Sequence, residues 1–66
     1  MMNNKPFTKL FKAYNAITGL YYRRAEGFNC PEASGATLVD EAELAILNYT
    51  YLNVKTELFG IKMLAA

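Results

Sequence analysis

The sequence contains no histidine and only one cysteine, Cys30. A single thiol cannot form an intramolecular disulfide, and one thiol with scattered carboxylates is not the ligand set of a zinc site. A catalytic cysteine normally needs a neighbouring base, and no histidine is present to serve as one. Carboxylates cluster only in 40–43, where helix capping accounts for them. We therefore expect a protein that is not an enzyme and that holds no metal and no cofactor.

Long apolar runs without polar residues are also missing. The most apolar stretch, 44–64, is interrupted by Asn48, Asn53, Lys55, Glu57 and Lys62. It is therefore not expected to span a membrane. The first residues lack the cationic head, apolar segment and cleavage site of a signal peptide. Together with the lone cysteine, these features favour a cytoplasmic protein.

The chain is short and apolar, with 66 residues of which 53% are hydrophobic. This length predicts a single domain over 1–66, whose core would contribute only ~3–5 kcal/mol of stability. Natural domains of this size often add a disulfide, a metal or oligomerisation. Because the first two are excluded, we expect the protein to form a homo-oligomer.

Two segments have the apolar spacing of helices. In the first, Pro6 suits the first helical position, Asn4 can cap before it, and Gly27 can end the helix. Between them, apolar residues recur at helical intervals. The sequence predicts a helix over 6–26, and a turn-rich loop over 27–37 follows.

The second predicted helix covers 38–64 and has two possible starts, a capping box at Thr37 or one at Asp40. A first apolar set on it has the 3-4-3-4-3 spacing of a helix that packs along another helix. This first set is Leu44, Leu47, Tyr51, Val54, Leu58 and Ile61. A second set lies roughly 150° away around the helix axis. The second set is Ala42, Ala45, Tyr49, Leu52, Phe59 and Met63.

Two helices joined by a loop predict an all-α fold, a two-helix antiparallel hairpin that assembles into a four-helix bundle or a larger helical oligomer. A hairpin can cover only one side of helix 38–64, so the other side needs a second copy or a different protein. We expect the first set to form an oligomer or partner interface. Which set packs within the hairpin and which between subunits stays open.

A basic face is predicted on helix 6–26. Lys5, Lys9, Lys12 and Arg23 fall within roughly 60° of one another on a helical wheel. Tyr22 lies at the edge of the apolar face beside them, as a candidate contact for a partner. This face is typical of a solvated helix surface, and could also bind an acidic protein or nucleic-acid phosphates.

These features favour a small non-catalytic helical protein that acts through protein–protein interaction, as a homo-oligomeric accessory, regulatory or inhibitor protein. One alternative is a nucleic-acid-binding regulator that uses the basic face. Another is a structural or virion assembly component. Expected partners are the protein itself and another protein, with nucleic acid as the less favoured partner.

Overall fold

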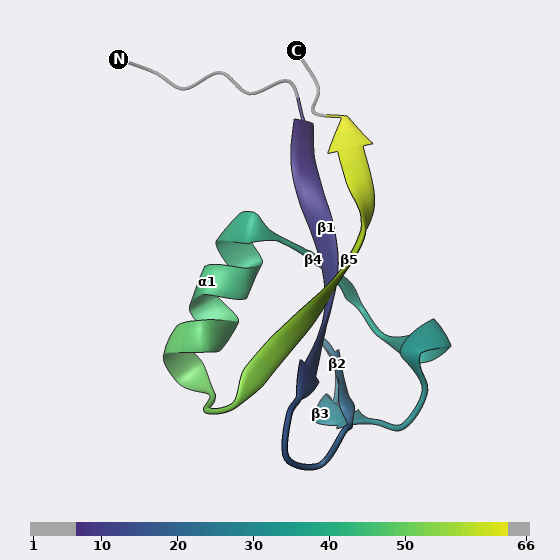
Figure 1. Ribbon diagram of the computed structural model, residues 1–66, viewed down its shortest axis with the longest axis vertical. Coiled ribbons are helices and arrows are strands. Elements are labelled where there is room, and N and C mark those ends of the chain that lie inside the picture. Colours follow the sequence, from purple (N-terminus) through teal and green to yellow (C-terminus); the bar gives the residue numbers. More distant parts are fainter. Residues whose placement is uncertain (1–6, 64–66) are drawn as a thin grey trace.

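The computed structural model describes residues 7–63 and shows five strands in one antiparallel sheet with a single α-helix of 10 residues. Figure 1 shows the helix beside a long, twisted pair of strands. In chain order the elements are β1 (Phe7–Asn15), β2 (Tyr21–Arg23), β3 (Gly27–Cys30), a 3-10 turn η1 (Ala33–Gly35), β4 (Leu38–Asp40), α1 (Glu41–Thr50) and β5 (Val54–Met63).

Strand β1 is the centre of the sheet. On one side it pairs with β5 along its whole length, from Phe7 opposite Met63 to Asn15 opposite Val54. On its other side β4 pairs with residues 10–12 and β2 pairs at Tyr14, with β3 beyond β2. Helix α1 packs against β1 and β4. The sheet is thus closely covered over β1 and β4, and β5 lies at its edge.

The predicted all-α hairpin and four-helix bundle are therefore wrong. The segment expected as helix 6–26 forms β1, β2 and the turn between them, and the segment expected as helix 38–64 forms β4, α1 and β5. Of the second predicted helix, the structure describes 38–63, and within that range only 41–50 is helical. The predicted loop 27–37 contains β3 and η1.

The turn after β1 also interrupts the first predicted helix, whose described part begins as a strand at Phe7. The side-chain oxygen of Asn15 accepts hydrogen bonds from the backbone N–H groups of Ile17, at 2.7 Å, and Thr18, at 3.1 Å. Gly19 follows with a φ of 76°, a backbone conformation that glycine adopts without steric cost. This local bonding reverses the chain and sends β2 back along β1.

Helix α1 has a well-defined start and end. Asp40 is its N-cap, and the Asp40 carboxylate accepts a hydrogen bond from the backbone N–H of Glu43 at 2.8 Å. The second of the two predicted starts is therefore the one used. After the helix ends at Thr50, Asn53 has a φ of 62° and turns the chain into β5. Asparagine tolerates this left-handed conformation better than most residues.

The core is small and lies where α1 meets β1, β2 and β4. Its buried residues are Ala13, Tyr22, Val39 and Leu47, with Phe11, Phe28, Leu44 and Val54 packed against them. Most of β5 contributes nothing to this cluster: only its first residue, Val54, packs there. Four large apolar side chains in the remainder of the strand, Leu58, Phe59, Ile61 and Met63, are exposed.

Candidate interaction surface on strand β5

Strand β5 is an edge strand with large apolar side chains in solvent. Within 7–63 it pairs only with β1, so its other edge has no strand beside it. The exposed fractions are 63% for Leu58, 58% for Phe59, 62% for Ile61 and 71% for Met63. An edge of this kind offers unpaired N–H and C=O groups that can pair with another strand.

A β-bulge at Phe59 decides which side chains share a face of β5. Leu58 lies opposite Phe11 and Gly60 lies opposite Leu10, which leaves Phe59 without a register partner. Side chains alternate along β1, so partners of odd-numbered β1 residues share one face. Leu58, Ile61 and Met63 are partners of this kind and lie on the α1 side of the sheet; we call them the β5 apolar row. Glu57, Gly60 and Lys62 lie on the opposite face.

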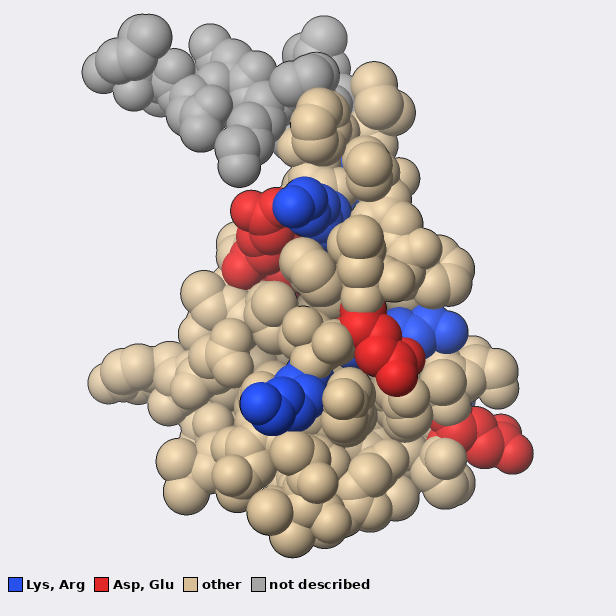
Figure 2. All heavy atoms as spheres, in the orientation of Figure 1, with Lys and Arg blue, Asp and Glu red and all other residues tan. Residues whose placement is uncertain are grey.

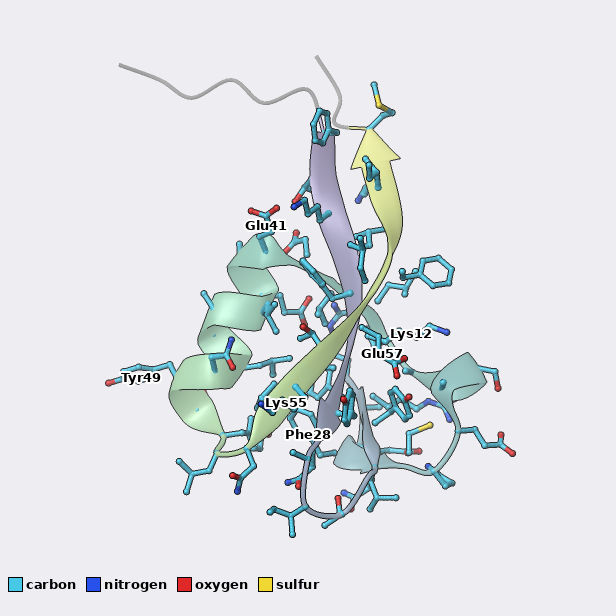
Figure 3. All side chains as sticks on the ribbon, viewed as in Figure 1. Lys12, Phe28, Glu41, Tyr49, Lys55 and Glu57 are labelled. Carbon is cyan, nitrogen blue, oxygen red and sulfur yellow. The ribbon has the colours of Figure 1, made fainter. Side chains whose placement is uncertain are left out.

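On that opposite face, β5 is joined to β1 and β2 by polar and aromatic contacts. The Tyr21 hydroxyl donates a hydrogen bond to Glu57 Oε2 at 3.1 Å, and the rings of Tyr14 and Tyr21 are 5.4 Å apart. Lys12 Nζ lies 4.9 Å from the centroid of the Phe59 ring, a cation–π contact. Figure 3 shows Lys12 and Glu57 close together beside β5. Partial burial, followed by the bond to the Glu57 carboxylate, raises the pKa of Tyr21 above its ordinary value.

Strand β5 carries charged as well as apolar side chains, since Lys55, Glu57 and Lys62 are interspersed with its apolar residues. Figure 2 shows isolated blue and red side chains on a surface that is otherwise uncharged. The outer edge of β5 is thus unpaired within 7–63 and the strand carries large exposed apolar side chains, a combination found at protein-binding surfaces.

Helix α1 has a second exposed apolar surface. Leu44 and Leu47 face the core, whereas Ile46 is 63% exposed and Tyr49 is 94% exposed. Figure 3 shows Tyr49 pointing away from the sheet. Within 41–50 the first predicted apolar set therefore faces inward, and the second faces solvent.

The structure separates the six residues of the predicted interface into three places. Leu44, Leu47 and Val54 belong to the core. Tyr51 packs edge-to-face on Phe28, with ring centroids 4.9 Å apart, and remains 41% exposed. Leu58 and Ile61 lie in the β5 apolar row. An interface role for these last two stays a prediction.

The predicted basic face is not gathered by the fold. Lys9 and Lys12 are three residues apart on β1, so they lie on opposite faces of the sheet. Arg23 is exposed at the end of β2, and Lys5 lies outside the described residues. Tyr22, expected to meet a partner, is only 8% exposed and packs on Phe28 at 5.2 Å. The predicted face assumed the residue spacing of a helix, and these residues separate because side chains on a strand alternate between its two faces.

Sequence reasoning missed the edge position and the bulge of β5. The signal that could have found the strand is the alternation of apolar or β-branched residues with charged residues in 54–58, which is typical of a half-exposed strand. The Tyr21–Glu57 bond carries no sequence signal, because the two residues are 36 positions apart.

Other chemistry is not concentrated in the described part of the chain. Residues 7–63 contain no group of three or more His, Cys, Asp or Glu placed to hold a metal ion. Within the same range, no helix has both the length and the apolar character needed to cross a membrane. Cys30 is buried, with its thiol 3.1 Å from the carbonyl oxygen of Glu32. Comparison with protein families, curated proteins and solved structures finds no match to this chain.

Proposed function

We propose that the protein acts without catalysis, by binding another protein chain along strand β5. The observation that carries this proposal is the coincidence of two features on one strand. One is an edge that has no neighbour within 7–63, and the other is a group of large apolar side chains that are more than half exposed. Addition of a strand to such an edge is a common mode of peptide and protein recognition.

The exposed apolar side chains of β5 can contribute substantially to the free energy of binding. Full burial of one Leu, Ile, Phe or Met side chain contributes about 1.5–3 kcal/mol. Leu58, Phe59 and Ile61 could each gain part of this when covered, and each new backbone hydrogen bond adds about 0.5–1.5 kcal/mol. These gains offset the loss of freedom on association. A small domain is therefore well suited to use β5 for binding.

The wider setting of this proposal is an accessory, regulatory or inhibitor role in the cytoplasm. The cytoplasmic part rests on the single cysteine, Cys30, which is not paired in a disulfide. Assembly into a structural particle would use the same edge. Nucleic-acid binding has less support, because Lys9, Lys12 and Arg23 are dispersed over the sheet.

Photo-crosslinking tests the use of β5. A photoreactive phenylalanine analogue replaces Phe59 in the full chain, and the same analogue replaces Ile17 in a control variant, because Ile17 is 76% exposed on the β1–β2 turn. We expect irradiation in the expressing cell to give a discrete protein adduct from position 59, which unlabelled chain competes away, and none from position 17. A third variant carries the analogue at Tyr49. Equal adducts at positions 59 and 17, or adducts only at position 49, would contradict binding through β5.

A further inference from the structure

The chemistry of β5 is complementary to itself. In an antiparallel pair related by a two-fold axis, each residue of one copy lies opposite a residue on the same face of the other copy. On a regular strand, opposite residues lie on the same face only in every second register. The bulge at Phe59 changes which registers meet it, because Glu57 and Lys62 share one face and Leu58 and Ile61 share the other.

We propose that β5 pairs antiparallel with β5 of a second copy around a two-fold axis between Phe59 and Gly60. This inference rests on the proposed function and names the occupant of the edge. In this register Glu57 lies opposite Lys62 of the second copy, and Leu58 lies opposite Ile61 of the second copy. Symmetry makes each of these pairs twice. The two sheets join into one continuous sheet.

Charge favours this register over its neighbours. A shift of two residues in one direction places Lys55 opposite Lys62 of the second copy, and like charges directly opposite are destabilising. A shift of two residues in the other direction places Lys62 opposite Phe59 and sets Glu57 opposite a position past the end of β5, so the pair of opposite charges is lost. In the proposed register opposite charges meet instead. Lys62 is available for this pairing, since it makes no hydrogen bond or ion pair within 7–63. Glu57 accepts the Tyr21 hydroxyl at Oε2, and its Oε1 has no hydrogen bond within 7–63, so Oε1 is left for Lys62 of the second copy.

Gly60 gives a second, independent argument. Its φ is not positive, and a Cβ added there would meet no atom within 4 Å, so nothing in the described part of the chain requires glycine. In the proposed pair, Gly60 lies opposite Phe59 of the second copy. A glycine on an edge strand leaves room for an aromatic ring from the neighbouring strand to lie across it. The pair therefore accounts for a residue that weakens an isolated strand.

The position of the axis also suits a second copy. Gly60 is opposite Leu10 of β1, and Leu10 is opposite Asp40, the N-cap of α1, so the axis lies level with the start of the helix. Figure 1 shows the upper part of β5 running beyond α1. A competing register centred on Thr56 would also set Lys55 opposite Glu57. That register brings Phe59 opposite Asn53, whose φ of 62° departs from an extended strand. The pairing centred between Phe59 and Gly60 uses only residues of β5, over 56–63.

Solution mass tests the pairing directly. Size-exclusion chromatography with light scattering, run on the full chain over a concentration series, should give twice the 7.4 kDa mass of one chain. The charge reversals Glu57→Lys and Lys62→Glu should each raise the dimer dissociation constant by about tenfold or more, since each turns two attractive pairs into repulsive ones. The combined variant Glu57→Lys/Lys62→Glu should return to within about threefold of the original value.

Two further variants keep the test specific. Lys55→Glu makes the same charge change on β5 and should leave the dissociation constant unchanged. Gly60→Val should retain the circular dichroism spectrum of the folded chain, because valine suits a strand and the site is open, but it should weaken the dimer by about tenfold or more. Circular dichroism on every variant separates loss of pairing from loss of fold.

The outcomes divide cleanly. A monomer at every concentration, a larger open polymer, or a dimer insensitive to Glu57→Lys, Lys62→Glu and Gly60→Val would overturn the pairing. Rescue of Glu57→Lys by Lys55→Glu would overturn it in favour of the Thr56-centred register. A monomer that still gives a competed adduct to a different protein at position 59 would overturn the dimer and leave the proposed function standing. A monomer without that adduct would overturn both.

Discussion

The two ends of the β1–β5 pair differ sharply although the same two strands build both. At one end Ala13 of β1 is fully buried, beneath α1 and beside Val39 of β4, which is also fully buried. At the other end Leu58 and Ile61 of β5 are 63% and 62% exposed. The difference comes from what lies alongside: α1, β2 and β4 all contact β1, and within 7–63 no strand pairs with the outer edge of β5.

The two ends of the β1–β5 pair are therefore expected to have different roles. The buried end supplies the stability of the chain, because its apolar groups are removed from water by the fold itself. The exposed end contributes little to folding and keeps its apolar area for association. A substitution at the buried end should therefore lower the free energy of unfolding. A substitution at the exposed end should instead weaken binding and leave the free energy of unfolding nearly unchanged.

The largest expected effect is the loss of a buried leucine. Leu47→Ala should lower the free energy of unfolding by about 2–4 kcal/mol, because Leu47 is 4% exposed in the core. Leu58→Ala should change it by less than about 0.5 kcal/mol, because Leu58 is mostly in solvent. Urea denaturation followed by circular dichroism, at a concentration too low for association, measures both. Equal losses in the two variants would remove the distinction between the ends.

The turn into β5 should show the next largest effect. Asn53→Ala should destabilise the chain by about 1–2 kcal/mol, because alanine is strained at a φ of 62°. Asn53→Gly is the matched control and should cost much less, since glycine adopts this conformation freely. Thermal unfolding of the two variants tests the difference. Similar costs would mean that the Asn53 side chain, and not its backbone conformation, stabilises the turn.

The helix cap should matter slightly less. Asp40→Ala removes the acceptor for the Glu43 N–H and should cost about 1 kcal/mol. Asp40→Asn retains an acceptor and should cost only a few tenths. Amide hydrogen exchange would locate the effect: faster exchange should appear in α1, while the amides of 58–63 should be unchanged. A change spread evenly over both ends would contradict their independence.

The start of α1 was readable from the sequence because a cap is a local signal. The Asp40-to-Glu43 spacing is one of the two predicted starts and is the one observed, whereas the start at Thr37, which gave the predicted bound of 38, is wrong because 38–40 forms β4. The end of the helix was missed because the apolar spacing continues past it. Leu47, Tyr51 and Val54 keep a 4-3 spacing across the turn at Asn53, so the turn is invisible to a search for periodicity.

The bulge in β5 explains why a strand resembled a helix. On a regular strand the same face recurs every two residues, so Val54 and Leu58 are two periods apart. The extra residue Phe59 turns the next interval, from Leu58 to Ile61, into three. The result is a 4-3 spacing that is indistinguishable from part of a coiled-coil pattern.

Strand β1 was mistaken for a different reason. It is central, so it carries apolar residues on both faces and lacks the alternation of a half-exposed strand. Phe11 contacts the core on the α1 side, whereas Tyr14 contacts Tyr21 on the other side. Residues from two faces then combine into helical intervals. The predicted basic face assumed those helical intervals, so its residues are dispersed once the segment forms strands.

The smallest expected effect lies at the bond that joins the exposed strand to the body. Burial and the Glu57 carboxylate both raise the pKa of Tyr21, so the folded chain holds the phenol proton more tightly than the unfolded chain does. The stability from this contact should be fully present below the ordinary tyrosine pKa of about 10, and should be lost as the pH rises through the folded value. Glu57→Gln should lower the Tyr21 pKa part of the way back, because the burial remains.

Alkaline titration of the Tyr21 ring signal by NMR measures this shift. Glu41→Gln is the matched control, since it removes one carboxylate at the start of α1, away from Glu57 in Figure 3, and should leave the Tyr21 titration unchanged. An unchanged Tyr21 pKa in Glu57→Gln would show that burial alone holds the proton. The Tyr21–Glu57 contact would then not couple β5 to β2, and a movement of the exposed end would not affect the buried end.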